Sequence, residues 1–246
     1  MRPTRLYSAL SFLPMCAAAQ GSLLAPSAVD ARRLTPGVSS GMIFVVRGGD
    51  TVQTGTFADE LVVRADTLIF VRGIYDGLLG QELDTIVSHV PDLMPISHSY
   101  SSLRGPAKGN GHFSFADTKT TGWSSDGLGK VTPINITRPA AAWSVMTVPL
   151  VLGATDLREG DTFMIQVFHP AYSESGKLTA VMLGSEQVHG RLCWRVNVFL
   201  DNADQFGTYW IDQVKRTVDR AISPASPGIS LLFETSREPA ERGRTP

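Results

Sequence analysis

The sequence breaks into short apolar runs separated by turn residues, and this pattern restricts the chain to a fold built from strands. Residues 42–46 (MIFVV) form one such run, and Gly48, Gly49 and Asp50 separate it from 51–57, which indicates a two-stranded hairpin. Residues 67–71 (TLIFV) form a second β-branched and aromatic run. The 23 glycines and 15 prolines supply frequent chain reversals and disfavour a helical bundle.

Alternation of side chains extends the strand prediction into the second half of the chain. Leu192, Trp194, Val196 and Val198 alternate with polar or small residues, so we expect them to share one inward face of a strand. Residues 78–90 and 211–222 fit either a helix or a strand, and we predict strands at both. Residues 140–152 could hold a short helix stopped by Pro149 or Gly153. The expected fold class is all-β, an antiparallel sandwich or half-barrel of about ten to thirteen strands with few or no helices.

The two ends of the chain have a different composition. Arg2 and Arg5 precede an uncharged apolar stretch and three alanines, which is typical of a secretory signal peptide at 1–19. We expect a linker at 20–33, a single β domain at 34–235 and a disordered tail at 236–246. No later run approaches the roughly 20 apolar residues of a spanning helix, so we expect no transmembrane segment. The chain is therefore predicted to be periplasmic or secreted.

The two cysteines allow two interpretations of the N-terminus. Leu13 is spaced from Cys16 as in a lipoprotein signal, but Pro14 and Met15 are poor intervening residues, so we favour removal of Cys16 and keep lipid anchoring there as the alternative. Cys193 is then the only thiol of the mature chain, and its apolar neighbours favour a buried, unreactive side chain.

Charge and motif spacing exclude several classes of function. The 22 basic and 23 acidic residues give a net charge of −1, so nothing indicates nucleic-acid binding. The five histidines lack the spacing of a zinc motif, and the glycine-rich loops lack the remaining residues of a nucleotide-binding fingerprint. We therefore predict no metal site and no cofactor.

One sequence motif matches a catalytic pattern. Residues 37–41 (GVSSG) match the Gly-x-Ser-x-Gly pattern, in which a strand leads into a strained turn and then a helix that exposes the serine. Here a loop leads into a strand instead, so we favour a structural role for Ser39. A secreted serine hydrolase that uses Ser39 with a histidine and an aspartate remains the alternative.

Several short motifs resemble a bacterial exported family of unknown function. They span about 34–234 and comprise 82–85 (ELDT), 93–95 (LMP), 183–188 (LGSEQV), 192–198 (LCWRVNV), 207–212 (GTYWID) and 216–220 (RTVDR). The resemblance implies an antiparallel β-sandwich or half-barrel, more distantly similar to the Lol-type lipoprotein carriers of the cell envelope. It implies no catalytic residue.

Strands that are apolar on both faces need a second cover or an apolar-lined concavity. We expect either a well-covered central strand or a pocket for an acyl chain or other apolar ligand, lined by four aromatic residues: Trp143, Phe163, Trp194 and Trp210. The predicted function is that of an envelope-associated, non-enzymatic module that binds a lipid, another apolar ligand or an envelope protein. A scaffold without a small ligand is the third interpretation.

Overall fold

The computed structural model describes residues 21–77, 80–103, 108–169, 174–200 and 204–236. The predicted signal peptide, Cys16 and residues 237–246 of the predicted tail lie outside these ranges. Within them, no helix is long and apolar enough to cross a membrane.

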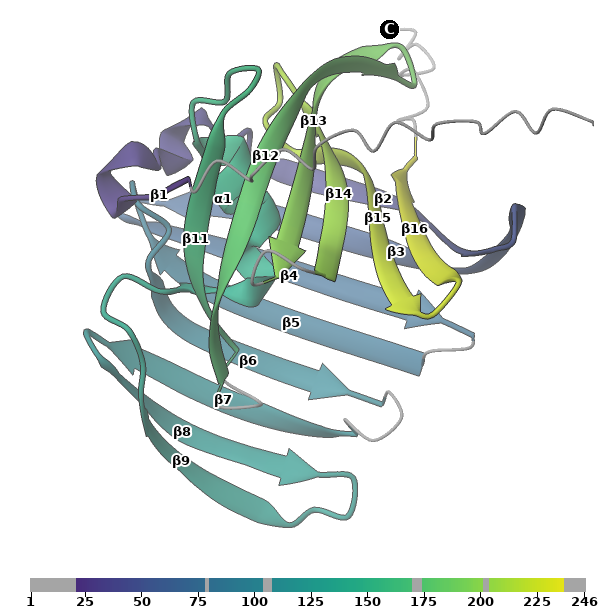
Figure 1. Cartoon of the computed structure of the whole chain (residues 1–246). Helices are drawn as coiled ribbons and strands as arrows, with labels where there is room; N and C mark the ends of the chain where they lie inside the picture. The colour runs from purple at the N-terminus through teal and green to yellow at the C-terminus, as the bar shows by residue number, and fades with distance from the viewer. Residues whose placement is uncertain (1–20, 78–79, 104–107, 170–173, 201–203, 237–246) are drawn as a thin grey trace, which may run out of the picture.

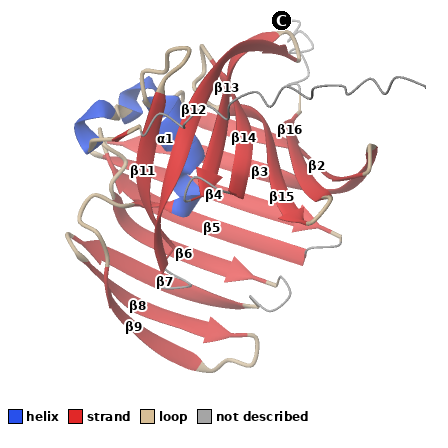
Figure 2. Ribbon diagram, viewed as in Figure 1, coloured by secondary structure: helices blue, strands red, loops and turns tan. Residues whose placement is uncertain are grey.

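Strands dominate the described residues, and together they form one sheet of 16 strands (Figure 2). The first half of the chain contributes β1 (Ser22–Leu23), β2 (Gly37–Arg47), β3 (Asp50–Arg64), β4 (Thr67–Asp76), β5 (Gly80–His89), β6 (Pro95–Ser102), β7 (Gly109–Ala116), β8 (Lys119–Asp126) and β9 (Val131–Thr137). The second half contributes β10 (Trp143–Ser144), β11 (Thr162–His169), β12 (Glu174–Val188), β13 (Arg191–Leu200), β14 (Asp204–Asp212), β15 (Val218–Ser226) and β16 (Ile229–Thr235).

The all-β class and the two uncertain strand assignments are confirmed, but the expected strand number is too low. Residues 80–89 form β5, and 211–222 form the end of β14, a turn and the start of β15. The sheet has 16 strands rather than ten to thirteen, in part because β1 and β10 have only two residues each. A strand of that length shows no alternation from which it could be predicted.

The sheet is an open meander with β1 and β9 at its ends, and it is antiparallel except where the short strands β1 and β10 pair parallel with β11. From one edge it runs through β1 and β11 to β16, and then, because β16 pairs with β2, through β2 to β9. The predicted hairpin joins β2 to β3, with Gly48 and Gly49 both at positive φ between the paired Arg47 and Asp50. The sheet curves, so that β2 to β9 form one wall and β11 to β16 a second wall facing it (Figure 1).

The helix α1 (Val148–Ala154) lies between the two walls, and all seven of its residues are buried. Pro149 does not stop this helix as expected, because it sits in the first turn, where its missing N–H costs no hydrogen bond. Gly153 does not stop it either. A Cβ at Gly153 would lie 2.1 Å from the carbonyl oxygen of Arg216, so the glycine allows α1 to approach the turn after β14.

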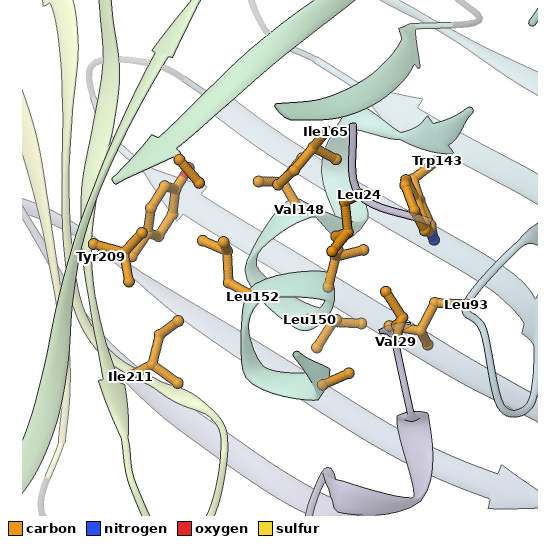
Figure 3. Close-up of a cluster of buried hydrophobic side chains, with 14 of the residues drawn as sticks. Leu24, Val29, Leu93, Trp143, Val148, Leu150, Leu152, Ile165, Tyr209 and Ile211 are labelled. Atoms are coloured by element: carbon orange, nitrogen blue, oxygen red, sulfur yellow. The ribbon is translucent and has the colours of Figure 1, made fainter. Parts of the chain in front are cut away.

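The main core joins side chains of both walls to α1 (Figure 3). Leu68 and Phe70 of β4 enter it, whereas Ile69 and Val71 on the opposite face are half-buried. Residues 21–33, expected as a linker, belong to the same unit. Ser22 pairs with Phe163, and the side chains of Leu24 and Val29 are buried in the main core.

Candidate functional site

A cavity of about 720 Å³ opens beside α1 at one end of the space between the walls. The residues that line it come from the segment before β2, from β2 to β4, from the start of α1, from the turn between β12 and β13, from the turn between β14 and β15 with the start of β15, and from the end of β16. Residues distant in sequence therefore meet around one space. Its volume is in the range of small-molecule sites.

The buried apolar part of the lining comes from two strands of the first wall and from the helix. Leu61 of β3 and Phe70 of β4 are neighbours across the two strands, and Leu150 of α1 also lines the cavity. All three side chains are more than nine-tenths buried. This surface is suited to a hydrocarbon segment, because it removes apolar area from water on several sides.

An ion pair lies within this apolar surface. The Arg72 guanidinium donates two hydrogen bonds to the Asp59 carboxylate, from Nε at 2.8 Å and from an Nη atom at 2.7 Å. Burial alone would lower the pKa of Arg72, but the charge of Asp59 and its hydrogen bonds with Arg72, together with the charge of Asp84, raise the pKa above its ordinary value. Burial raises the pKa of Tyr209, which belongs to the opposite wall, to about 12. Arg72 is therefore charged and Tyr209 neutral at ordinary pH.

The rest of the lining is more polar and carries an excess of positive charge. Arg72, Arg191 and Lys215 line the cavity with Asp59 as the only carboxylate among the described lining residues. The Arg191 guanidinium lies 2.8 Å from a carboxylate oxygen of Asp219, which is buried. Burial raises the pKa of Asp219, and the charge of Arg191 opposes that shift.

Two of the four predicted pocket residues belong to the core rather than to the cavity lining. Trp143 is fully buried, and its indole N–H donates a hydrogen bond of 2.8 Å to the backbone oxygen of Asp92. Phe163 of β11 is also buried in the main core. Both side chains are part of the main core, and Figure 3 shows Trp143 in the same cluster as Val148 and Leu150 of α1.

The other two predicted residues lie on opposite faces of the second wall. Trp194 packs against the main core, and the Arg216 guanidinium lies 4.2 Å from the centre of its ring. Trp210 belongs to a separate small cluster with Val188 and Cys193. The structure thus brings Trp143, Phe163 and Trp194 into contact with one core and leaves Trp210 outside it.

One of the four residues expected on the inward face of β13 is exposed. Trp194, Val196 and Val198 face the main core as predicted, but Leu192 is 46% exposed, at the end of the strand. Cys193 is buried on the other face, and burial raises the pKa of its thiol to about 12. The expectation of a buried, unreactive cysteine is consistent with both observations.

Ser39 lines the cavity, but not in the setting of a nucleophile motif. It lies inside β2, so neither the sharp turn nor the following helix of that motif is present. His189 lines the same cavity and has Nδ1 at 3.3 Å from Asp219. Within the described ranges, no hydrogen bond joins Ser39 to a histidine, and no three potential metal ligands gather.

Asp59 and Arg72 are two charged lining residues that the sequence analysis did not identify. A signal for them was present, because Arg72 has the same parity along its strand as Leu68 and Phe70. A charged residue at an inward position of an apolar strand is rare unless it is paired. The period-two rule therefore marks Arg72 as a buried charge.

Comparison with solved structures finds chains of low similarity. A DUF1329 family protein from Desulfovibrio piger has 10% identity over 86% of this chain and 90% of that chain, with a TM-score of 0.27. The hypothetical lipoprotein YmcC from Escherichia coli has 14% identity over 82% and 88%, with a TM-score of 0.32. A putative outer membrane lipoprotein-sorting protein domain from Vibrio parahaemolyticus has 10% identity over 87% and 90%, with a TM-score of 0.20. At these scores we draw nothing about ligand or activity from them.

Comparison of the sequence with known families identifies the family of the chain. No curated protein matches the sequence significantly. A family model described as protein of unknown function (DUF3108) matches residues 51–223, which is more than half of the chain. The matched region runs from β3 to β15 and includes both Asp59 and Arg72. The expected membership of a family of unknown function is thus confirmed: the chain belongs to the DUF3108 family.

Proposed function

We propose that this protein is a non-enzymatic binding module of the bacterial cell envelope that holds an amphipathic, lipid-like molecule in the cavity beside α1. The hydrocarbon segment would lie against Leu61, Phe70 and Leu150, and the polar end would meet charged residues. An envelope protein that delivers or receives such a lipid is the partner this proposal implies.

The observation that carries the proposal is the combination of apolar and charged lining in one space. The cavity of about 720 Å³ has buried apolar side chains from two strands of the first wall and from a helix, together with the paired Asp59 and Arg72. Pockets that are mainly apolar with a few placed polar groups are typical of small-molecule sites.

The test is binding of a fluorescent apolar probe, such as cis-parinaric acid, to the mature chain. Ser39→Trp should fill the cavity, since Ser39 pairs with Asp59 across β2 and β3 on the lined side. We expect this variant to weaken probe binding about tenfold or more, because the indole occupies the volume that the chain needs.

Thr56→Trp is the matched control. Thr56 is exposed on β3 and does not line the cavity, so the same indole there should leave probe binding unchanged. The proposal fails if the wild-type protein binds no alkyl-chain probe, or if both variants bind it as the wild type does.

The alternative is a serine hydrolase, and one observation keeps it testable: Ser39 and His189 line the same cavity. A fluorophosphonate probe labels an activated serine covalently. We expect no labelling of Ser39, and Ser39→Ala should change no esterase signal. Labelling that disappears in Ser39→Ala would favour the hydrolase instead.

The envelope location rests on the signal-like N-terminus and is tested separately. N-terminal sequencing of the protein from the envelope fraction should show that the chain begins after residue 19. A chain that still begins at Met1 would contradict export, and a lipid on Cys16 would replace the soluble form with an anchored one.

A further inference from the structure

The ion pair in the cavity is one end of a row of polar side chains on the inner face of four neighbouring strands. Asp59 of β3 is directly opposite Arg72 of β4, and Arg72 is directly opposite Asp84 of β5. The row ends at His98 of β6, whose Nε2 lies 2.7 Å from Oδ1 of Asp84. The cavity lining on this wall ends at β4, and Asp84 lies on the next strand, β5. Adjacent strands are about 4.8 Å apart, so Asp84 is about that distance beyond the lining residues.

The inner end of this row is deeply buried and only partly satisfied. Asp84 is 2% exposed and His98 is 3% exposed. Oδ2 of Asp84 and Nδ1 of His98 have no hydrogen-bond partner among the described residues. A buried polar atom without a partner costs stability, so two of them on one contacting pair indicate that another polar group belongs there.

Aromatic and polar side chains surround the pair. The His98 ring centre lies 6.3 Å from that of Tyr100 and 6.1 Å from that of Phe113, and Tyr100 stacks on Phe113. His169 approaches from β11 of the opposite wall. Burial lowers its pKa to about 4, so His169 is neutral at ordinary pH.

The chemistry of the two unpartnered atoms decides what they can take. An ionised Asp84 only accepts hydrogen bonds, so Nε2 of His98 carries the proton of the bond between them. In neutral His98 the other ring nitrogen, Nδ1, is then an acceptor. Two unpartnered acceptors on one contacting pair require a group that donates hydrogen bonds.

We propose that Asp84 and His98 form the inner end of the ligand site and receive a headgroup that donates hydrogen bonds, either hydroxyls or an ammonium group. This inference rests on the proposed lipid-like ligand and adds its headgroup. The tail would then lie along Leu61, Phe70 and Leu150, past the Asp59 and Arg72 pair. A carboxylate headgroup would face the Asp84 oxygen with a like charge and is disfavoured.

The test compares three lipids with the same chain and different headgroups, each used to displace the apolar probe. We use 1-monooleoylglycerol for hydroxyls, oleylamine for ammonium and oleic acid for carboxylate. The wild type should bind one of the two donor lipids about tenfold more tightly than oleic acid, because only a donor satisfies both acceptors. Which of the two binds better identifies the source of the donor.

Two variants assign the preference to the pair. Asp84→Asn and His98→Gln should each remove about tenfold of the preference for the donor lipid. His112→Gln is the matched control, because His112 lies on β7, bonds to Ser99 and is outside the row. Urea midpoints of all variants show whether they fold.

The outcomes separate this inference from the proposed function. If the wild type binds all three lipids equally, the two atoms hold only water and the inference is wrong, whether or not the variants fold. If the wild type binds none of the three lipids nor the probe, the proposed function itself fails. If the preference survives in both Asp84→Asn and His98→Gln, the headgroup lies elsewhere.

Discussion

The space between the two walls has two regions of opposite character. Around α1 it is packed with apolar side chains, and the helix itself is buried along its whole length. Across β3 to β6 the same inner face carries Asp59, Arg72, Asp84 and His98. The first region stabilises the fold through burial of apolar surface. The second region costs desolvation, which its internal pairing offsets only in part.

The contrast between the two regions indicates where a ligand site is expected in a protein without a catalytic motif. A core that only had to hold the walls together would continue the apolar surface across β4 and β5. Charged side chains at these inward positions weaken the core, and two of their atoms lack partners among the described residues. The packed region therefore explains stability, and the polar row marks the region in which a ligand is expected.

The largest expected effect lies in the packed region. Trp143→Ala should lower the free energy of unfolding by about 3–5 kcal/mol, because it removes a fully buried indole and leaves a cavity. Trp123 of β8 is 39% exposed, so Trp123→Ala should cost about 1 kcal/mol or less. Urea unfolding measures both, and equal losses would contradict the difference in packing.

The polar row should respond differently to single and double replacement. Arg72→Leu should cost about 1–3 kcal/mol, because it leaves the Asp59 carboxylate without its two hydrogen bonds. The double variant Asp59→Leu with Arg72→Leu should recover most of that loss, since replacing both partners of a buried pair is often neutral. A double variant less stable than either single variant would mean that the row is structural.

Trp194 and Arg195 test the two faces of β13. Trp194→Ala should cost about 1–3 kcal/mol, because the half-buried ring packs on the main core and under Arg216. Arg195→Ala should cost about 0.5 kcal/mol, since Arg195 is exposed. If urea midpoints fall equally in the two variants, the assignment of opposite environments is wrong.

The smallest expected effect is a pH dependence from His169. Its pKa is lowered by burial to about 4 from an ordinary value of 6.5, so the unfolded chain takes up a proton that the folded chain does not. Stability from this group is therefore present above pH 6.5 and is lost as the pH falls toward about 4. His169→Gln should show a smaller drop in urea midpoint between pH 7 and pH 5 than the wild type. Identical drops would contradict a neutral buried imidazole.

Local sequence signals were sufficient for the longer strands but not for the order in which the strands pair. The turn at Gly48 and Gly49 and the alternation around Val196 follow from short-range rules. The pairing of β16 with β2 and the insertion of α1 are long-range, and no local pattern reports them. For this reason the packing of residues 21–33 and the burial of Cys193 with Trp210 on a second face could not be predicted in detail.

The apolar character of the candidate site could be predicted from the sequence, but the identity of its lining residues could not. Aromatic content suggested an apolar site, but Trp143 and Phe163 are core residues, while the cavity uses Leu61, Phe70 and Leu150. Which apolar residues face a cavity depends on how the two walls meet. The polar row was accessible in principle, because Arg72 and Asp84 occupy inward positions of their strands.

The most direct test of the central claim is a crystal structure of the protein with 1-monooleoylglycerol. We expect the oleoyl chain along Leu61, Phe70 and Leu150 and the glycerol hydroxyls within hydrogen-bond distance of Asp84 Oδ2 and His98 Nδ1. A cavity that holds only water while the lipid lies elsewhere or is absent would contradict a ligand site between the walls.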